Sequence, residues 1–203
     1  ADELDQASKG YIRRLLAKGD LPVELGKTLL LYSVPGIATA RVLLVYCGEE
    51  EKFTHPQFRK VMYCVATRIK SMQLDRIANY LPQQEVSDLD FYGRIRHTIE
   101  LIEDSFYTFD QFKTKKTDKP LYSPPKEFAF FNGNDSSKPS KIEEVIKQAV
   151  AISAGIKLAK DLAKLPANIC TPSYMAEQAK SLAKEAGLAI TVLEKEAIEK
   201  EGM

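Results

Sequence analysis

The sequence predicts an α/β fold in which a mixed or largely parallel sheet is flanked by helices. Short runs rich in Leu, Val and Ile alternate with amphipathic stretches of ten or more residues, the pattern of strands separated by helices. Glycine and proline stand between these runs, where the chain has to turn. The 203 residues, 44% of them hydrophobic, are enough to bury a sizeable core.

The first third of the chain predicts a helix, two strands and a longer helix. Residues 2–18 have the apolar spacing of an amphipathic helix, which we expect to end at Gly19. Strands follow over residues 27–33 and 41–47, and the second is apolar enough for a buried central position in the sheet. An apolar period of about 3.6 residues then predicts a helix over residues 55–72.

The middle of the chain continues this alternation. Residues 76–81 predict a strand, which Pro82 stops, and residues 88–109 predict a helix. The polar, proline-containing stretch 113–125 predicts a surface loop. A short strand is predicted over residues 127–131, and residues 132–138, rich in Asn, Gly, Asp and Ser, predict a turn or a mobile tip.

Two helices are predicted to meet at a stiff elbow near Pro166. Ser140 and Glu143 have the spacing of a capping box, so the first helix should begin near Lys141. Its apolar stripe is too wide for a helix lying on one surface, so we expect cover on more than one side. Leu165 and Pro166 end it, because proline lacks an amide hydrogen and crowds the preceding residue.

Clear end signals mark the second helix of the elbow. Thr171 is the expected N-cap, Pro172 the first helical residue, and Gly187 the left-handed C-cap. Residues 188–193 then predict a buried strand, and residues 194–201 a short helix closed by Gly202.

This elbow resembles the segment that joins the two domains of the leucyl aminopeptidase (cytosol aminopeptidase) family, which typically reads R-D-L-x-N-x-P-x-N-x-x-T-P. The residues that stand in register with this motif are Asp161, Pro166, Asn168, Thr171 and Pro172. Lys160 and Lys164 depart from it, since they replace the usual arginine and asparagine. A second block over residues 107–116 is similar to the family's Y-x-F-D-x-F/Y-K-S-K-K.

The resemblance implies a division of the chain into three parts. Residues 1–138 would form an N-terminal α/β domain, residues 139–165 the interdomain helix, and residues 166–203 the beginning of the catalytic domain. Members of the family begin with one or more strands, whereas this chain opens on a predicted helix. We therefore expect the N-terminal domain to lack its first strand or strands.

The resemblance also implies an activity for the intact protein. Enzymes of the family hydrolyse N-terminal residues, preferably leucine, from peptides in the cytoplasm, as hexamers that carry two divalent metal ions, Mn or Zn. The metal-binding motif, similar to N-T-D-A-E-G-R-L, does not occur in this chain. We assign no catalytic or metal-binding residue here, and we expect these residues to support the catalytic domain and oligomer assembly while being inactive alone.

The residues themselves reveal no catalytic constellation. Gly26-Lys27-Thr28 lacks the upstream glycine of a phosphate-binding loop. His55 and His97 predict satisfied surface histidines, although His97 and Glu100 have the spacing to meet on one helix face. Cys170 precedes a helix, where thiolate is favoured, but it has no paired histidine in the sequence pattern.

One basic cluster supports a second reading. Lys113, Lys115 and Lys116 lie beside Phe109 and Phe112, and basic residues mixed with aromatic ones can contact a nucleic-acid backbone. A DNA-binding or regulatory module is therefore the alternative function. Without such a function, the same residues would simply form a solvated loop. A small-ligand domain is a third reading, which no glycine-rich turn supports.

Composition excludes several other classes of protein. Lys and Arg total 29 against 28 acidic residues, so net charge predicts no attraction to a charged membrane. No apolar run approaches the ~18 residues that a membrane span needs. Three cysteines without C-x-x-C spacing predict a reduced, cytosolic setting.

Overall fold

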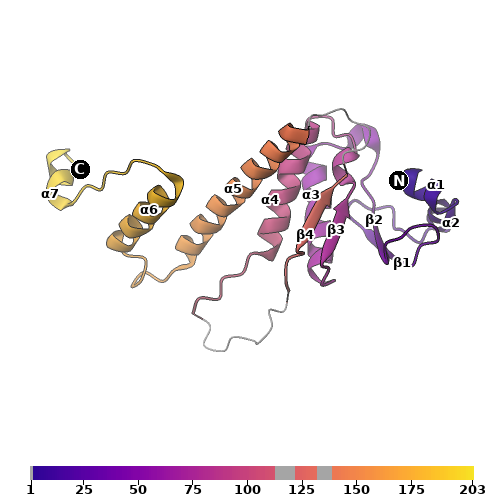
Figure 1. The fold of residues 1–203 in the computed structure, drawn as a ribbon, viewed down its shortest axis with the longest axis horizontal. Coiled ribbons are helices and arrows are strands. Elements are labelled where there is room, and N and C mark those ends of the chain that lie inside the picture. Colours follow the sequence, from indigo (N-terminus) through magenta and orange to yellow (C-terminus); the bar gives the residue numbers. More distant parts are fainter. Residues whose placement is uncertain (1, 113–121, 132–138) are drawn as a thin grey trace. The chain divides into compact units, whose positions relative to one another are not determined.

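The computed structural model describes residues 2–112, 122–131 and 139–203. These residues form two compact units, Ala1–Lys157 and Leu158–Met203. Helices dominate both, and the first unit also contains two pairs of strands (Figure 1). The predicted α/β class is confirmed.

The strands form two small sheets. β1 (Thr28–Tyr32) and β2 (Arg41–Val45) pair antiparallel, whereas β3 (Arg76–Asn79) and β4 (Glu127–Phe130) pair parallel. The sequence predicted one mixed or largely parallel sheet with residues 41–47 in a central position. The described strands instead form two separate pairs, and β2 is not central. Only Val42 of β2 is buried. An apolar run shows that a strand is covered, but it does not fix how many strands pair with it.

The N-terminal helix is broken in two. α1 (Asp2–Ala7) and α2 (Tyr11–Ala17) are separated at Lys9 and Gly10, which have left-handed φ angles of 52° and 75°. The prediction of one continuous helix over residues 2–18 is therefore wrong. Gly10 adopts this conformation without steric cost, because it has no Cβ, and so it allows the chain to reverse there.

The main core lies between α3 (His55–Lys70) and α4 (Phe91–Phe106). Thr54 and Gln57 form a capping box at the start of α3, and Phe58 and Met62 are fully buried on its inner face. Short 3₁₀ turns precede α3 (Glu50–Lys52) and follow β3 (Leu81–Gln83). The predicted helices over residues 55–72 and 88–109 are confirmed with shorter ends.

α5 (Pro139–Lys164) runs beside α4 (Figure 1). Its buried Ala149 packs with Ile95 and Ile99 of α4 in a separate core cluster. α5 begins at Pro139, two residues before the predicted start, so Ser140 lies inside the helix. Proline suits a first helical position because its φ is already fixed near the helical value.

The cover predicted for α5 on more than one side is not found among the described residues. The apolar side chains of Val150, Ile152 and Ile156 are exposed there.

The second unit contains the predicted elbow. α5 ends at Lys164, and α6 (Pro172–Ala186) begins after Thr171 and ends at Gly187, whose φ is 66°. α7 (Lys195–Lys200) forms the predicted final helix, with Gly202 in the left-handed region. These end signals are confirmed.

The strand predicted for residues 188–193 is wrong. The structure gives these residues no regular hydrogen-bonded element, and Leu188, Ile190 and Leu193 are exposed. A strand needs a neighbour with which to exchange backbone hydrogen bonds. The apolar character of the run is real, but no described segment pairs with it.

No helix in the described ranges combines the length and apolar character that crossing a bilayer requires.

Candidate functional site

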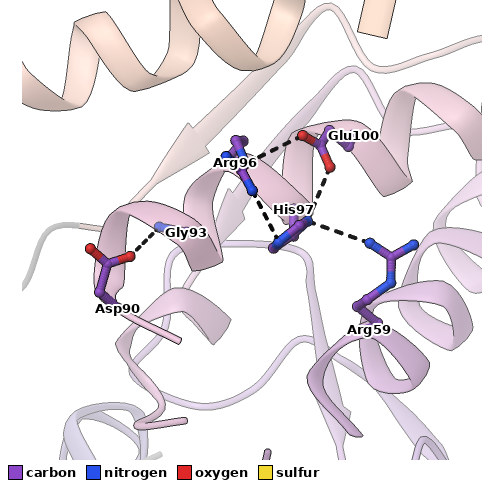
Figure 2. A network of polar contacts seen from close by, with 6 residues as sticks. All are labelled: Arg59, Asp90, Gly93, Arg96, His97 and Glu100. Atoms are coloured by element: carbon purple, nitrogen blue, oxygen red, sulfur yellow. Dashed lines mark hydrogen bonds and ion pairs between the residues drawn. The ribbon is translucent and has the colours of Figure 1, made fainter. Parts of the chain in front are cut away.

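A cluster of polar side chains lies where α3 meets α4 (Figure 2). Asp90 caps α4, with its Oδ1 accepting a hydrogen bond from the amide of Gly93 at 2.7 Å. The cap fixes where the helix starts, and therefore which residues share a face. His97 and Glu100 lie one turn apart and meet on that face.

The His97 imidazole is buried and hydrogen-bonded. Its Nδ1 lies 3.0 Å from Oε2 of Glu100. Since an ionised carboxylate only accepts hydrogen bonds, Nδ1 carries the proton of this bond. Nε2 is then the acceptor nitrogen, and Nη2 of Arg96 lies 3.5 Å from it. The Arg96 Nε is also 3.4 Å from Oε1 of Glu100, so the carboxylate joins both side chains.

The environment lowers the pKa of His97 below its ordinary value. Burial is the largest cause, because it disfavours the charged imidazolium. Glu100 acts in the opposite direction, through its hydrogen bond and its negative charge, and the neighbouring His55 and Arg96 lower the pKa further. His97 is therefore held in its neutral form more firmly than an exposed histidine.

A second imidazole lies against the first. The ring of His55, at the start of α3, has its centroid 4.4 Å from that of His97, with a tilt of 31° between the planes. Its backbone amide donates to Oδ1 of Asp88 at 2.6 Å. The Nε2 of His55 is buried and has no hydrogen-bond partner among the described residues.

The sequence predicted part of this cluster. The contact between His97 and Glu100 is confirmed, but the expectation that both histidines are surface residues is wrong for His97, which is 8% exposed. The contact between His55 and His97 was missed, because 42 positions separate them and only the packing of α3 on α4 joins them. The apolar stripes that predict this packing were the available signal.

Neither a metal-binding group nor an activated thiol is found among the described residues around this cluster and β2. Across the described ranges, no three His, Cys, Asp or Glu side chains lie together in a way that could hold a metal ion. Burial raises the pKa of the Cys47 thiol to about 11, which makes it a poor nucleophile. The described residues therefore do not fit a di-metal centre.

The family-motif residues build the elbow between α5 and α6. The Pro166 carbonyl accepts hydrogen bonds from the amides of Ile169 and Cys170, at 2.9 and 3.0 Å. The hydroxyl of Thr171 accepts one from the amide of Tyr174 at 3.3 Å, and Pro172 is the first residue of α6. This turn connects two helices, and the thiol within it, Cys170, is free and half-buried.

The remaining predicted residues lie beside this turn or outside the described part of the chain. Asp161 lies within α5 and Asn168 is exposed in the turn. The candidate nucleic-acid contacts Lys113, Lys115 and Lys116 lie outside the described residues.

Two sequence models of one family match the chain. The model described as "Cytosol aminopeptidase family, N-terminal domain" matches residues 1–116, and "Cytosol aminopeptidase family, catalytic domain" matches residues 157–203. The two matches follow one another along the chain, and the second begins within α5.

Curated relatives extend the match. A probable cytosol aminopeptidase of Haemophilus influenzae (strain PittEE) is 36% identical over 203 residues, which is 100% of this chain and 40% of the relative. A probable cytosol aminopeptidase of Thioalkalivibrio sulfidiphilus is 39% identical over 207 residues, 98% of this chain and 40% of the relative. The chain thus spans about two fifths of the length of these relatives.

Solved structures share the fold. A mutant of tomato leucine aminopeptidase superposes with a TM-score of 0.74 at 21% identity, over 99% of this chain and 38% of that one. The bottromycin maturation enzyme BotP in complex with Mn gives a TM-score of 0.69 at 21% identity, over 94% of this chain and 37% of that one. At this identity the likeness concerns the fold alone.

Proposed function

Because the chain belongs to the cytosol aminopeptidase family, we propose that it forms the N-terminal domain, the interdomain helix and the beginning of the catalytic domain of a di-metal leucyl aminopeptidase. The single observation that carries this proposal is that both family models match one chain in that order. The divisions we propose are residues 1–138, 139–165 and 166–203.

The proposed reaction is the release of N-terminal residues, preferably leucine, from peptides, with two Mn or Zn ions. The relatives named as cytosol aminopeptidases support the reaction class, and the solved relative in complex with Mn supports the kind of metal. Three free cysteines, none paired in a disulfide, suit a cytoplasmic setting. The described residues of this chain do not fit the metals, so we derive no catalytic step from them.

The role proposed for these residues is structural. Capping by Thr171 and the fixed φ of Pro172 hold the start of α6 at a defined point after α5. A turn of this kind suits a connection that has to position a catalytic domain. We propose that the stretch supports that domain and the assembly of a homo-hexamer, and that alone it has no peptidase activity.

The experiment that tests the proposal compares two proteins on one substrate. The natural gene product and the 203-residue chain are each incubated with Mn²⁺ and leucine p-nitroanilide, and p-nitroaniline release is recorded. We expect release by the natural product, its loss on addition of a chelator, and no release by the chain. Release by the 203 residues would overturn the inactivity, and a natural product that is inactive with both Mn²⁺ and Zn²⁺ would overturn the enzymatic proposal.

A further inference from the structure

Two guanidinium groups from different helices reach the same imidazole (Figure 2). Nη1 of Arg59, on α3, lies 3.4 Å from Nδ1 of His97, and Nη2 of Arg96, on α4, lies 3.5 Å from Nε2 of the same ring. Both arginines are exposed residues, so a solute can reach them. The two cations thus flank one buried ring at the surface of the α3–α4 pair.

The N–H donors of Arg59 that face Nδ1 of His97 find no hydrogen-bond acceptor there. Nδ1 of His97 already donates to Glu100, so it cannot also accept from Arg59. The described residues include no carboxylate in an ion pair with Arg59. Arg96 shares Glu100 through its Nε, at 3.4 Å, and keeps further N–H donors.

Charge at the cluster is unbalanced. Arg59 and Arg96 contribute two positive charges, and Glu100 contributes one negative charge. α3 contains no Asp or Glu in any of its 16 residues. Asp88 lies further out, where its Oδ1 accepts a hydrogen bond from the backbone amide of His55. Directly around the His97 ring the positive charges outnumber the negative one, and positive charge with unused donors favours the binding of an anion.

We propose that Arg59 and Arg96 bind a small phosphate-bearing anion, either inorganic phosphate or a phosphomonoester, at the edge of the His97 ring. The planar fork of a guanidinium matches two phosphate oxygens, and two forks can share one phosphoryl group. Phosphate is favoured over a carboxylate because it offers more oxygens and a larger charge to two cations at once. This site rests on the α3–α4 pair and does not depend on peptidase activity.

NMR titration of the 203-residue chain tests the site. The ring-proton signal of His97 is followed while inorganic phosphate is added at constant ionic strength, with NaCl as the balancing salt. We expect a saturating shift, and an imidazole that protonates at higher pH with phosphate than without it, because a bound anion stabilises the imidazolium. A shift that grows linearly without saturation would show general salt effects and overturn the proposal.

Matched variants separate the site from surface charge in general. Arg59→Gln and Arg96→Gln should each weaken phosphate binding about tenfold, the loss expected for one charge-assisted hydrogen bond. Arg68→Gln removes the same charge from an exposed position of α3 and should leave the affinity unchanged. Equal weakening by all three variants would contradict a defined site.

Further titrations identify the anion. Phenyl phosphate that binds more tightly than inorganic phosphate would assign the site to phosphomonoesters, and the reverse order would assign it to free phosphate. Acetate that binds as tightly as phosphate would overturn the assignment to phosphate, since the site would then select for negative charge alone.

Discussion

Burial places the His97 imidazole where its charged form is disfavoured, and this makes stability depend on pH. The pKa of His97 is lowered in the folded chain from its ordinary value of 6.5. The unfolded chain therefore binds more protons than the folded chain once the pH falls below about 6.5. The stabilisation is fully present above that pH, and is lost as the pH falls through the folded value.

The first prediction concerns this dependence. The free energy of unfolding, measured with urea, should fall between about pH 7 and about pH 5, where an ordinary histidine titrates. The variant His97→Gln cannot be protonated at this position and should lose a smaller part of its stability over the same range. An identical pH dependence in both chains would show that His97 is not the group responsible.

Thr171 supports a second prediction at the scale of one side chain. Thr171→Ala removes the hydroxyl that accepts from the Tyr174 amide, and should cost about 1 kcal/mol of helix stability. Thr171→Ser keeps a hydroxyl at this position and should retain most of the helix stability. Hydrogen exchange of the first α6 amides measures both. If hydrogen exchange of these amides were accelerated equally in the two variants, a capping role would be contradicted.

At Thr171 and His97, the contacts with residues nearby in the sequence were predictable. The contacts of His97 with another helix were not. The cap at Thr171 and the meeting of His97 with Glu100 follow from residue types at short spacing, which a sequence displays directly. The burial of His97 and its stacking on His55 depend on how α3 packs against α4. That packing is determined by many side chains at once, so it cannot be inferred from the sequence around either histidine.

At the scale of elements, Gly36 has the least room around it of the glycines in the described ranges. Its φ is 74°, and a Cβ added there would lie 2.1 Å from the carbonyl oxygen of Ala7. The turn between β1 and β2 therefore approaches the end of α1 closely. This contact joins the N-terminal helices to the strand pair.

The third prediction uses two glycines as a matched pair. Gly36→Ala should destabilise the chain by more than about 2 kcal/mol, because the turn strains and the α1 backbone has to move. Gly155→Ala lies within α5, where an added Cβ meets nothing within 4 Å, and should stabilise it by about 0.5–1 kcal/mol. Thermal unfolding of both variants checks this, and a loss at Gly155 as large as that at Gly36 would contradict it.

Elements with strong end signals were predictable, and their pairing was not. α6 has a threonine cap, a proline at its first position and a glycine beyond its last, and its bounds follow from them. The break at Gly10 was missed because the apolar period continues across it. Residues 188–193 have strand composition, yet a strand forms only where a partner edge is available.

At the scale of the whole chain, exposed apolar residues predict self-association. Leu188, Ile190, Val192 and Leu193 are all exposed within one short segment. Exposed apolar side chains gathered in this way favour contact between molecules. The described residues provide no cover for them.

The fourth prediction tests this association by light scattering over a concentration series. The mean particle size of the chain should rise with concentration, and Ile190→Lys should reduce the rise. Thr191→Lys adds the same charge at the next position without removing an apolar side chain, and should reduce it less. A chain that remains a monodisperse monomer at every concentration would contradict the prediction.

We proposed that this chain belongs to a longer metallo-aminopeptidase, and the mass of the natural gene product is the direct test of that proposal. Intact mass spectrometry of that product is compared with the 22.8 kDa of the chain. Because the chain covers 40% of the length of its relatives, we expect a product about two and a half times as large. A natural product of 22.8 kDa would contradict the claim and would direct the search for function to binding rather than hydrolysis.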